Sequence, residues 1–281
     1  MVMLLVTTAV LTFLPATVVA QSRAQSPGPW LAKTRDGQPD LQGIWRITPG
    51  LTVYSYDIQD PAPDVAYPGR GEAFKKTFKP LIVDPADGKI PYQPWAREKR
   101  QQLYQAAFAP KHLQEMDPQA FCVPGGPPRM AYQFPFQIFQ YPGHVVMVSE
   151  FAHVYRVIPL DGRPHLPNEI MLFMGDSRGR WEGNTLVVEV KNNNGRNWLD
   201  VAGDFHSDQY TVVERWTRVT SDSLVYEVTI QDPIVYTRPW KMRIDLIPQE
   251  SDYEFIEHAC HEGNINFDFT RLGRDGKTGA K

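Results

Sequence analysis

The sequence of 281 residues has little of what identifies most protein classes: it contains only two cysteines and no cofactor-binding fingerprint. Beyond its first 20 residues it also lacks the run of roughly 20 apolar residues that a membrane-spanning helix needs. Its 29 basic and 32 acidic side chains give a formal net charge of -3, which disfavours nucleic acid and anionic membranes as partners. We therefore expect neither a cofactor nor a nucleic-acid partner.

The first 20 residues, Met1 to Ala20, contain no charged side chain and end in small residues before Gln21. This pattern predicts a cleaved secretory signal peptide at residues 1–20. An uncleaved anchor helix is the alternative, but Pro15 interrupts the apolar run. We expect a periplasmic or secreted protein, with no membrane insertion after the signal peptide is removed.

Cys122 and Cys260 are the two cysteines of the chain. In an oxidising compartment such a pair predicts a disulfide, which here would close a long loop and constrain the unfolded chain strongly. The alternative is a metal site formed by His258, Cys260, His261 and Glu262. Their spacing is not one of the common zinc patterns, so the disulfide is favoured and no metal is expected.

Most of the chain after residue 143 consists of short β-rich segments separated by turns such as Asp161-Gly162. Eight or more strands at short spacing predict an all-β fold, an antiparallel meander that forms either a barrel or a sandwich. Gly43-Ile-Trp45 is typical of the opening strand of lipocalin-like barrels, in which the tryptophan closes one end; the alternative is a tryptophan buried in any β core. Repeated prolines between residues 52 and 95 predict long wrapping loops.

Trp95–Ala109 is rich in strong helix formers and predicts one short helix on the outside of the sheet or across one mouth. Residues 21–38 are expected to be a flexible lead-in, and residues 273–281 a polar tail. We therefore expect a single β-barrel-like domain over residues 39–272.

The segment Tyr210–Val219 carries charge on both faces of an expected strand. Because side chains alternate along a strand, Glu214 and Trp216 share one face and Arg215 lies on the other. This predicts a barrel with a partly polar interior, in which Glu214 is a candidate catalytic residue and Arg215 and Trp216 bind a ligand. His206, in the preceding loop, is a second catalytic candidate that would cover the pocket. The structural alternative is a lattice of ion pairs with residues of the following strands, namely Glu227, Arg238, Arg243 and Asp245.

Glu150 and His153 form a further candidate pair for proton transfer, on the first expected hairpin. Arg156 faces the opposite side of that hairpin and is a candidate ligand-binding residue. Arg163 and His165, beside an expected turn, are candidates for binding an anionic ligand at a barrel mouth. The alternative for each is an ordinary structural role, as a hydrogen-bonded polar group or a turn residue.

Ser177 lies between Gly175 and Gly179, in the Gly-x-Ser-x-Gly letters of a hydrolase nucleophile elbow. An elbow needs a strand before the serine and a helix after it. Here the following Arg-Trp-Glu-Gly-Asn-Thr indicates a hairpin instead. We therefore do not expect Ser177 to act as a nucleophile.

Several short motifs, spread over nearly the whole mature chain, resemble those of a group of uncharacterised exported bacterial proteins. The resemblance implies export and a single domain, and it implies no reaction, cofactor or catalytic residue. The residues that carry it are Pro39–Trp45, Tyr92–Ala96, Asp161–Arg163, Gly179–Val187, Glu214-Arg215, Asp232-Pro233 and Cys260–Asn264.

Two main hypotheses for the function follow. The first is an exported barrel that binds a small amphipathic or aromatic organic ligand in a pocket with a few polar groups. The second is a cofactor-independent lyase, isomerase or hydrolase that uses His and Glu for proton transfer and Arg to stabilise an oxyanion. A carbohydrate-active protein is a third possibility, since Trp and Tyr occur beside carboxylates.

Overall fold

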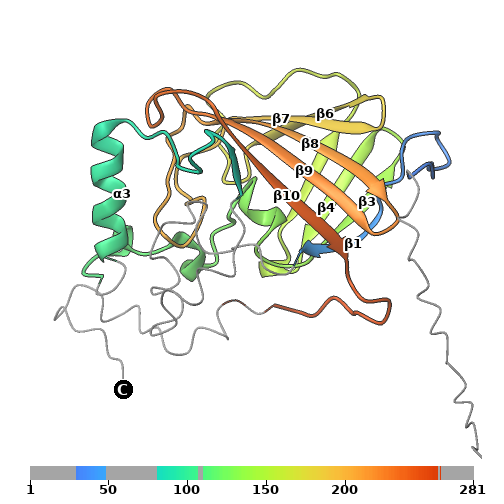
Figure 1. Cartoon of the computed structure of the whole chain (residues 1–281), viewed down its shortest axis with the longest axis horizontal. Helices are drawn as coiled ribbons and strands as arrows, with labels where there is room; N and C mark the ends of the chain where they lie inside the picture. Colours follow the sequence, from blue (N-terminus) through green and yellow to red (C-terminus); the bar gives the residue numbers. More distant parts are fainter. Residues whose placement is uncertain (1–29, 49–80, 107–109, 259, 261–281) are drawn as a thin grey trace, which may run out of the picture.

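The computed structural model describes residues 30–48, 81–106, 110–258 and 260, which are coloured in Figure 1. The expected signal peptide, the polar tail, His261 and Glu262 lie outside these residues, as do most of the lead-in and the proline-rich stretch up to residue 80. Within the described part of the chain, no helix has the length and apolar character needed to cross a membrane.

The described elements are ten strands, one α-helix and four short 3-10 helices. In chain order they are β1 (Gly43–Ile47), β2 (Ile82–Asp84), α3 (Pro94–Ala106), η1 (Leu113–Glu115), η2 (Pro118–Phe121), η3 (Arg129–Ala131), β3 (Phe136–Tyr141), β4 (His144–Ser149), η4 (Phe151–His153), β5 (Tyr155–Pro159), β6 (Asp176–Glu182), β7 (Thr185–Lys191), β8 (Thr211–Thr220), β9 (Ser223–Gln231) and β10 (Trp240–Pro248).

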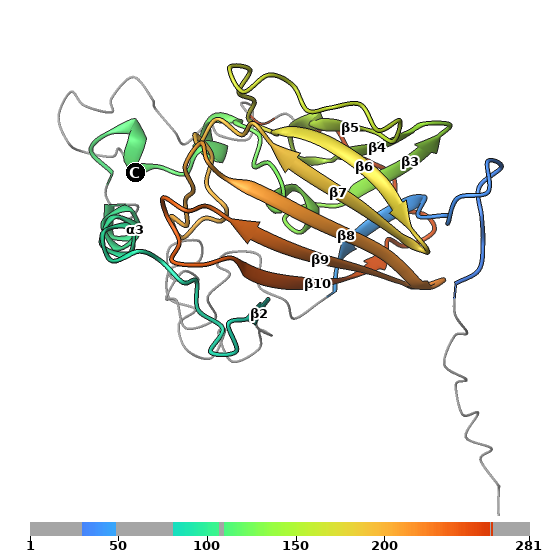
Figure 2. The ribbon, with the colours of Figure 1, turned by 90° about the horizontal axis from the view of Figure 1, so that it is seen from above.

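The strands form one antiparallel sheet in the order β5-β4-β3-β1-β10-β9-β8-β7-β6, with the short β2 paired to β10. Apart from β2 and the step from β5 to β6, strands that follow one another in the chain pair with each other, and the first strand pairs with the last at Trp45 and Pro248. The sheet therefore curls into a nearly closed barrel (Figures 1 and 2). The all-β prediction is confirmed, and of its two alternatives the structure shows the barrel.

The barrel has one seam, between β5 and β6. Because all pairings are antiparallel and the path has nine strands, β5 and β6 run in the same direction. Side chains fill the seam: Arg156 Nε on β5 donates to Ser177 Oγ on β6 at 2.8 Å. Nearby, a Cβ atom at Gly179 would lie only 2.8 Å from a methyl carbon of Ile158, so β5 packs directly on the backbone of β6. Ser177 thus lies in a strand that is followed by a hairpin, and not in a nucleophile elbow.

The seam corrects one expectation from the sequence. The turn at Asp161-Gly162 does not join paired strands, because the chain after β5 must return to the opposite end of the barrel before β6 begins at Asp176.

Trp45 is fully buried near one end of the barrel, which we call the Trp45 end. The Arg218 guanidinium lies 4.9 Å from the Trp45 ring and 3.7 Å from the ring of Trp30. Arg218 also donates to the backbone carbonyls of Gln42 and Ser221, at 3.1 and 2.9 Å. Trp45 therefore helps to close this end, as its Gly-x-Trp context predicted, and Trp30 in the expected lead-in belongs to the closure.

The opposite end, which we call the helix end, carries α3 and the irregular segments between strands (Figure 2). The helix begins at Pro94, whose missing N–H costs nothing in a first turn. Its buried residues are Ala96, Arg100 and Tyr104, spaced by four. The prediction of one short helix is confirmed, and its described part ends at Ala106.

Candidate functional site

Glu214 lies on β8 inside the barrel and is completely buried. One carboxylate oxygen accepts a hydrogen bond from Tyr226 Oη at 2.5 Å, and the other forms an ion pair with Arg156 of β5. Burial, together with the charge of Glu214, raises the pKa of Tyr226 well above its ordinary value. The phenol therefore keeps its proton at neutral pH and acts as a donor.

Arg156 reaches Glu214 across the barrel interior. It is 4% exposed, and its Nη1 has no hydrogen-bond partner among the described residues. The predicted pairing with residues of the following strands was wrong. Glu227, Arg243 and Asp245 alternate onto the outer surface of the sheet, and Arg238 lies before β10, where it pairs with Asp84. On the outer surface Arg243 lies 3.0 Å from Asp245 and 3.8 Å from Glu227.

Trp216 and Arg215 occupy opposite faces of β8, as the alternation predicted. Trp216 is completely buried and stacks on Tyr226, with 3.8 Å between the ring centroids. Arg215 lies on the outer surface, where it donates to Glu182 at 2.8 Å. The structure therefore does not bring Arg215 to Glu214, and it places Trp216 in the core.

His206 lies in the loop before β8 and is 3% exposed. Its Nε2 lies 2.9 Å from Asn197 Oδ1, its Nδ1 lies 2.9 Å from the Ser207 carbonyl, and its ring stacks on Tyr210. Burial lowers the pKa of His206 to about 4, although the Ser207 carbonyl and the charge of Asp232 act in the opposite direction. At neutral pH this pKa leaves the enclosed ring uncharged with a single N–H, which donates to only one of these two oxygens.

Glu150 and His153 lie in the tight turn between β4 and β5, not on strands. Glu150 is buried and accepts a hydrogen bond from Tyr253, whose pKa burial and this contact raise to about 12. His153 is exposed and has a left-handed backbone with φ 51°. The turn directs Glu150 inward and leaves His153 at the surface, and no contact joins the two side chains among the described residues.

Arg163 and His165 follow β5 in the segment that crosses to β6. Arg163 forms an exposed ion pair with Asp161, and its side-chain hydrogen bonds hold the pKa of that carboxyl at about 2. His165 Nδ1 lies 2.8 Å from Asp176 Oδ2, and Arg178 binds the other oxygen of Asp176 at 2.6 Å. The contact of His165 with Asp176 therefore fixes the crossing segment to β6, whereas Arg163 pairs within that segment.

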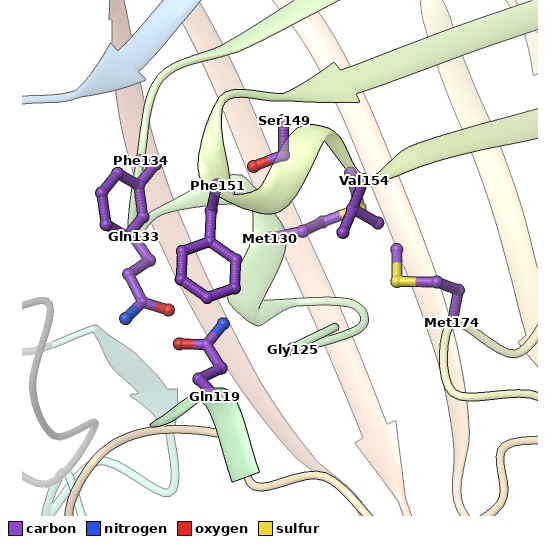
Figure 3. A pocket seen from close by; sticks show the side chains of 9 residues that line it. All are labelled: Gln119, Gly125, Met130, Gln133, Phe134, Ser149, Phe151, Val154 and Met174. Atoms are coloured by element: carbon purple, nitrogen blue, oxygen red, sulfur yellow. The ribbon is translucent and has the colours of Figure 1, made fainter. Parts of the chain in front are cut away.

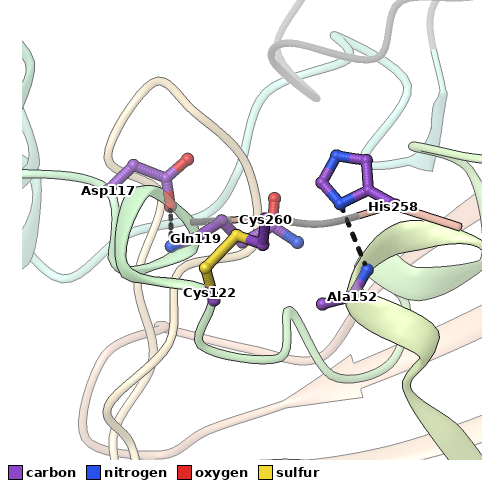
Figure 4. Close-up of a disulfide and its surroundings, with 6 residues drawn as sticks. All are labelled: Asp117, Gln119, Cys122, Ala152, His258 and Cys260. Carbon is purple, nitrogen blue, oxygen red and sulfur yellow. Dashed lines mark hydrogen bonds between the residues drawn. A yellow bond between two sulfur atoms is a disulfide. The ribbon is translucent and has the colours of Figure 1, made fainter. Parts of the chain in front are cut away.

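Cys122 and Cys260 form the predicted disulfide, with a Cα–Cα distance of 5.8 Å (Figure 4). Cys122 ends η2 in a left-handed conformation, which caps that helix. Cys260 is therefore not available as a metal-binding thiolate, and the described residues contain no group of three His, Cys, Asp or Glu side chains placed to hold a metal ion. A disulfide fits a protein that folds in an oxidising compartment.

Two cavities lie at the helix end. The first is enclosed by η4 and the segments around it, and its lining includes Gln119, Ser149 and Phe151 (Figure 3). The volume open to the centre of a water molecule is about 10 Å³, which is room for about one water. Gln119 Oε1 has no described partner and borders this space, so a single water suits the cavity and an organic ligand does not fit.

The second cavity is an open cleft of about 340 Å³, within the range of about 300–1,000 Å³ that is usual for small-molecule sites. We call it the Phe121–Trp198 cleft. Most of its lining is apolar, and the polar part comes from one amide and one guanidinium. Its six described lining residues are Gln114, Met116, Pro118, Phe121, Arg196 and Trp198.

Two polar side chains behind the cleft hold its walls together. Arg129 is 1% exposed and forms a two-point ion pair with Asp117, with contacts of 2.6 and 2.9 Å, while it also donates to the Trp198 carbonyl at 3.3 Å. Asn197 donates from its amide to the carbonyls of Gly125 and Phe173, at 2.8 and 3.1 Å. The two walls are therefore fixed to each other before any ligand arrives.

None of the candidate residues from the sequence lines the Phe121–Trp198 cleft. The cleft residues come from two irregular segments about 80 positions apart, which no periodic pattern connects. One local signal was present: Asp117 caps η2 by accepting from the backbone N–H of Gln119, directly before Pro118.

The chain matches no protein-family model, no characterised protein and no solved structure. The function must therefore be argued from the geometry of the chain itself.

Proposed function

We propose that this protein is an exported β-barrel that binds a small amphipathic or aromatic organic ligand in the Phe121–Trp198 cleft. The observation that carries the proposal is the cleft itself, about 340 Å³ in volume, with apolar walls and two polar side chains. Pockets for small organic molecules combine an apolar lining with a few placed polar groups in this way. The barrel interior, by contrast, is filled by side chains such as Trp216 and Leu186 that have no exposed surface.

The position of Glu214 favours binding over acid–base catalysis. A general base must come within hydrogen-bond reach of a substrate proton. Glu214 is completely buried and already engaged by Arg156 and Tyr226, and it lines neither of the two cavities. His206 is likewise enclosed. We therefore assign these side chains to the architecture that supports the cleft.

Export is proposed on two grounds. The first is the charge-free segment Met1 to Ala20 with its small residues before Gln21. The second is the Cys122–Cys260 disulfide, which is expected to persist outside the cytosol. The resemblance to exported bacterial proteins agrees with both.

The experiment that tests ligand binding is a titration with N-phenyl-1-naphthylamine, an uncharged aromatic probe that fluoresces in apolar sites. Gln114 is exposed at the rim, so Gln114→Trp fills the cleft without disturbing the core. We expect the wild type to bind the probe with one saturable site and Gln114→Trp to lose it.

The matched control is Gln42→Trp, which places the same bulky side chain on an exposed glutamine at the Trp45 end of the barrel. It should bind the probe like the wild type. Equal binding of the probe by the wild type and Gln114→Trp would overturn the proposal. The proposal would also fail if neither the wild type nor the control showed saturable binding. Mass spectrometry of small molecules extracted from the purified native protein would identify the natural ligand.

A further inference from the structure

We infer that the ligand of the Phe121–Trp198 cleft is an anion, an aromatic or amphipathic molecule with a carboxylate or sulfonate group that contacts Arg196. The inference rests on the proposed function and adds the charge of the ligand to it. It starts from the one charged group among the six described lining residues, which is the Arg196 guanidinium.

The acidic side chains nearest to the cleft in the chain are turned to other partners. Glu115 accepts hydrogen bonds from the backbone N–H groups of Lys111 and His112, at 2.6 and 3.2 Å. Asp117 is held by both terminal nitrogens of Arg129. Neither carboxylate lines the cleft, so among the described lining residues the positive charge of Arg196 has no negative counterpart.

Arg196 itself is ready to bind. Its side chain is exposed, and no hydrogen bond or ion pair from its guanidinium joins it to another described residue. A guanidinium presents a planar fork of donors that matches a carboxylate or sulfonate at two points, and it also stacks on aromatic rings. Trp198, two residues on, supplies an aromatic surface in the same lining.

The backbone that carries Arg196 is fixed on both sides. Its own N–H donates to Asn194 Oδ1 at 3.1 Å, and the next residue, Asn197, is anchored by Gly125 and His206. The charge therefore stays at the cleft without an ordering cost for the backbone. The remaining cost is that of the exposed side chain, so the gain from the contact is modest.

The magnitude follows from the exposure of Arg196. Solvent-exposed ion pairs contribute about 0.2–1 kcal/mol, so one such contact corresponds to an affinity gain of up to about fivefold. A two-point contact between the guanidinium and the acidic group keeps the expected gain near the upper end of that range.

The test compares two probes that differ by one acidic group: N-phenyl-1-naphthylamine, which is neutral, and 8-anilinonaphthalene-1-sulfonate, its sulfonated counterpart. We expect the wild type to bind the sulfonate about three to five times more tightly than the neutral probe at low ionic strength. In Arg196→Gln this preference should disappear, because only the sulfonate loses affinity. Arg35→Gln, which removes an exposed charge at the Trp45 end, should keep the preference.

The outcomes separate the inference from the proposed function. If Gln114→Trp abolishes binding of both probes but Arg196→Gln leaves the sulfonate affinity unchanged, the site stands and the anion assignment is wrong. If Arg35→Gln weakens the sulfonate as much as Arg196→Gln does, the effect is one of overall charge, and the assignment is again wrong. If Gln114→Trp affects neither probe, the proposed function fails together with the inference.

Discussion

Replacing Glu214 by glutamine removes a charge that is completely enclosed, and it leaves the Arg156 guanidinium 4% exposed and without an anion. Breaking a buried ion pair on one side costs about 3–5 kcal/mol, because the remaining charge keeps its desolvation cost and loses its compensation. Tyr226 can still donate to the new amide oxygen, so the loss should come from Arg156. We expect Glu214→Gln to be among the most destabilising polar substitutions in the barrel.

The matched control is Glu182→Gln. The Glu182 side chain is 41% exposed and contacts Arg180 and Arg215, each at 2.8 Å. It therefore tests the same chemical change in an ion pair that water screens, where the expected loss of stability is much smaller. The difference between the two variants isolates the effect of burial.

The measurement is equilibrium unfolding in guanidinium chloride at neutral pH, followed by tryptophan fluorescence and extrapolated to water. A double-mutant cycle completes it: Arg156→Met removes the second charge. The double variant should lose about 1–3 kcal/mol less than the sum of the two single losses, because no buried charge remains. Equal losses for Glu214→Gln and Glu182→Gln would refute the architectural role. So would a stable Glu214→Gln protein that no longer binds the neutral probe.

Three further predictions concern the Cys122–Cys260 disulfide, the buried imidazole of His206 and the seam between β5 and β6. The disulfide spans a sequence separation of 138, so loss of Cys122 and Cys260 should lower the free energy of unfolding by about 5 kcal/mol on loop entropy, measured as a shift in the denaturant midpoint; a loss below about 1 kcal/mol would contradict this. His206 has a pKa of about 4 when folded against about 6.5 when unfolded, so its stabilising contribution is complete above about pH 6.5 and falls by about 3 kcal/mol as the pH drops to 4. The His206→Gln variant should lack this part of the acid destabilisation, and parallel stability curves for the two proteins would rule the imidazole out as its source. At Gly179 an added Cβ would lie 2.6 Å from a methyl carbon of Leu160. Gly179→Val should therefore lower the free energy of unfolding by about 1–3 kcal/mol and speed amide hydrogen exchange in β5 and β6. Unchanged exchange would show that the seam has room for the side chain.

The period-two pattern made the facing of single strands predictable. Glu214 and Trp216 point inward and Arg215 outward, because alternation depends on local backbone geometry alone. The disulfide was predictable because the chain has two cysteines and was expected to fold in an oxidising compartment. These features required no knowledge of which strands meet.

The partners of those side chains were not predictable in the same way. Glu214 pairs with Arg156, 58 positions earlier, because the sheet curls until β5 faces β8 across the interior. Curvature and closure are properties of the whole sheet, and they leave no signal in a single strand. The cleft was missed for a related reason, since Phe121 and Trp198 come from irregular segments that Arg129 and Asn197 bring together.

The seam between β5 and β6 follows from parity. A meander whose strands alternate in direction can close with a continuous antiparallel ladder only if their number is even, and the closing path here has nine, so β5 and β6 meet side by side in parallel without a ladder between them. This barrel therefore resembles a tube with one lengthwise joint, in which Arg156, Ser177 and Gly179 do by side-chain packing what backbone hydrogen bonds do elsewhere. The buried pair of Arg156 and Glu214 ties the strand on one side of the joint to the far wall. Loss of this pair should therefore first open the barrel along the seam between β5 and β6.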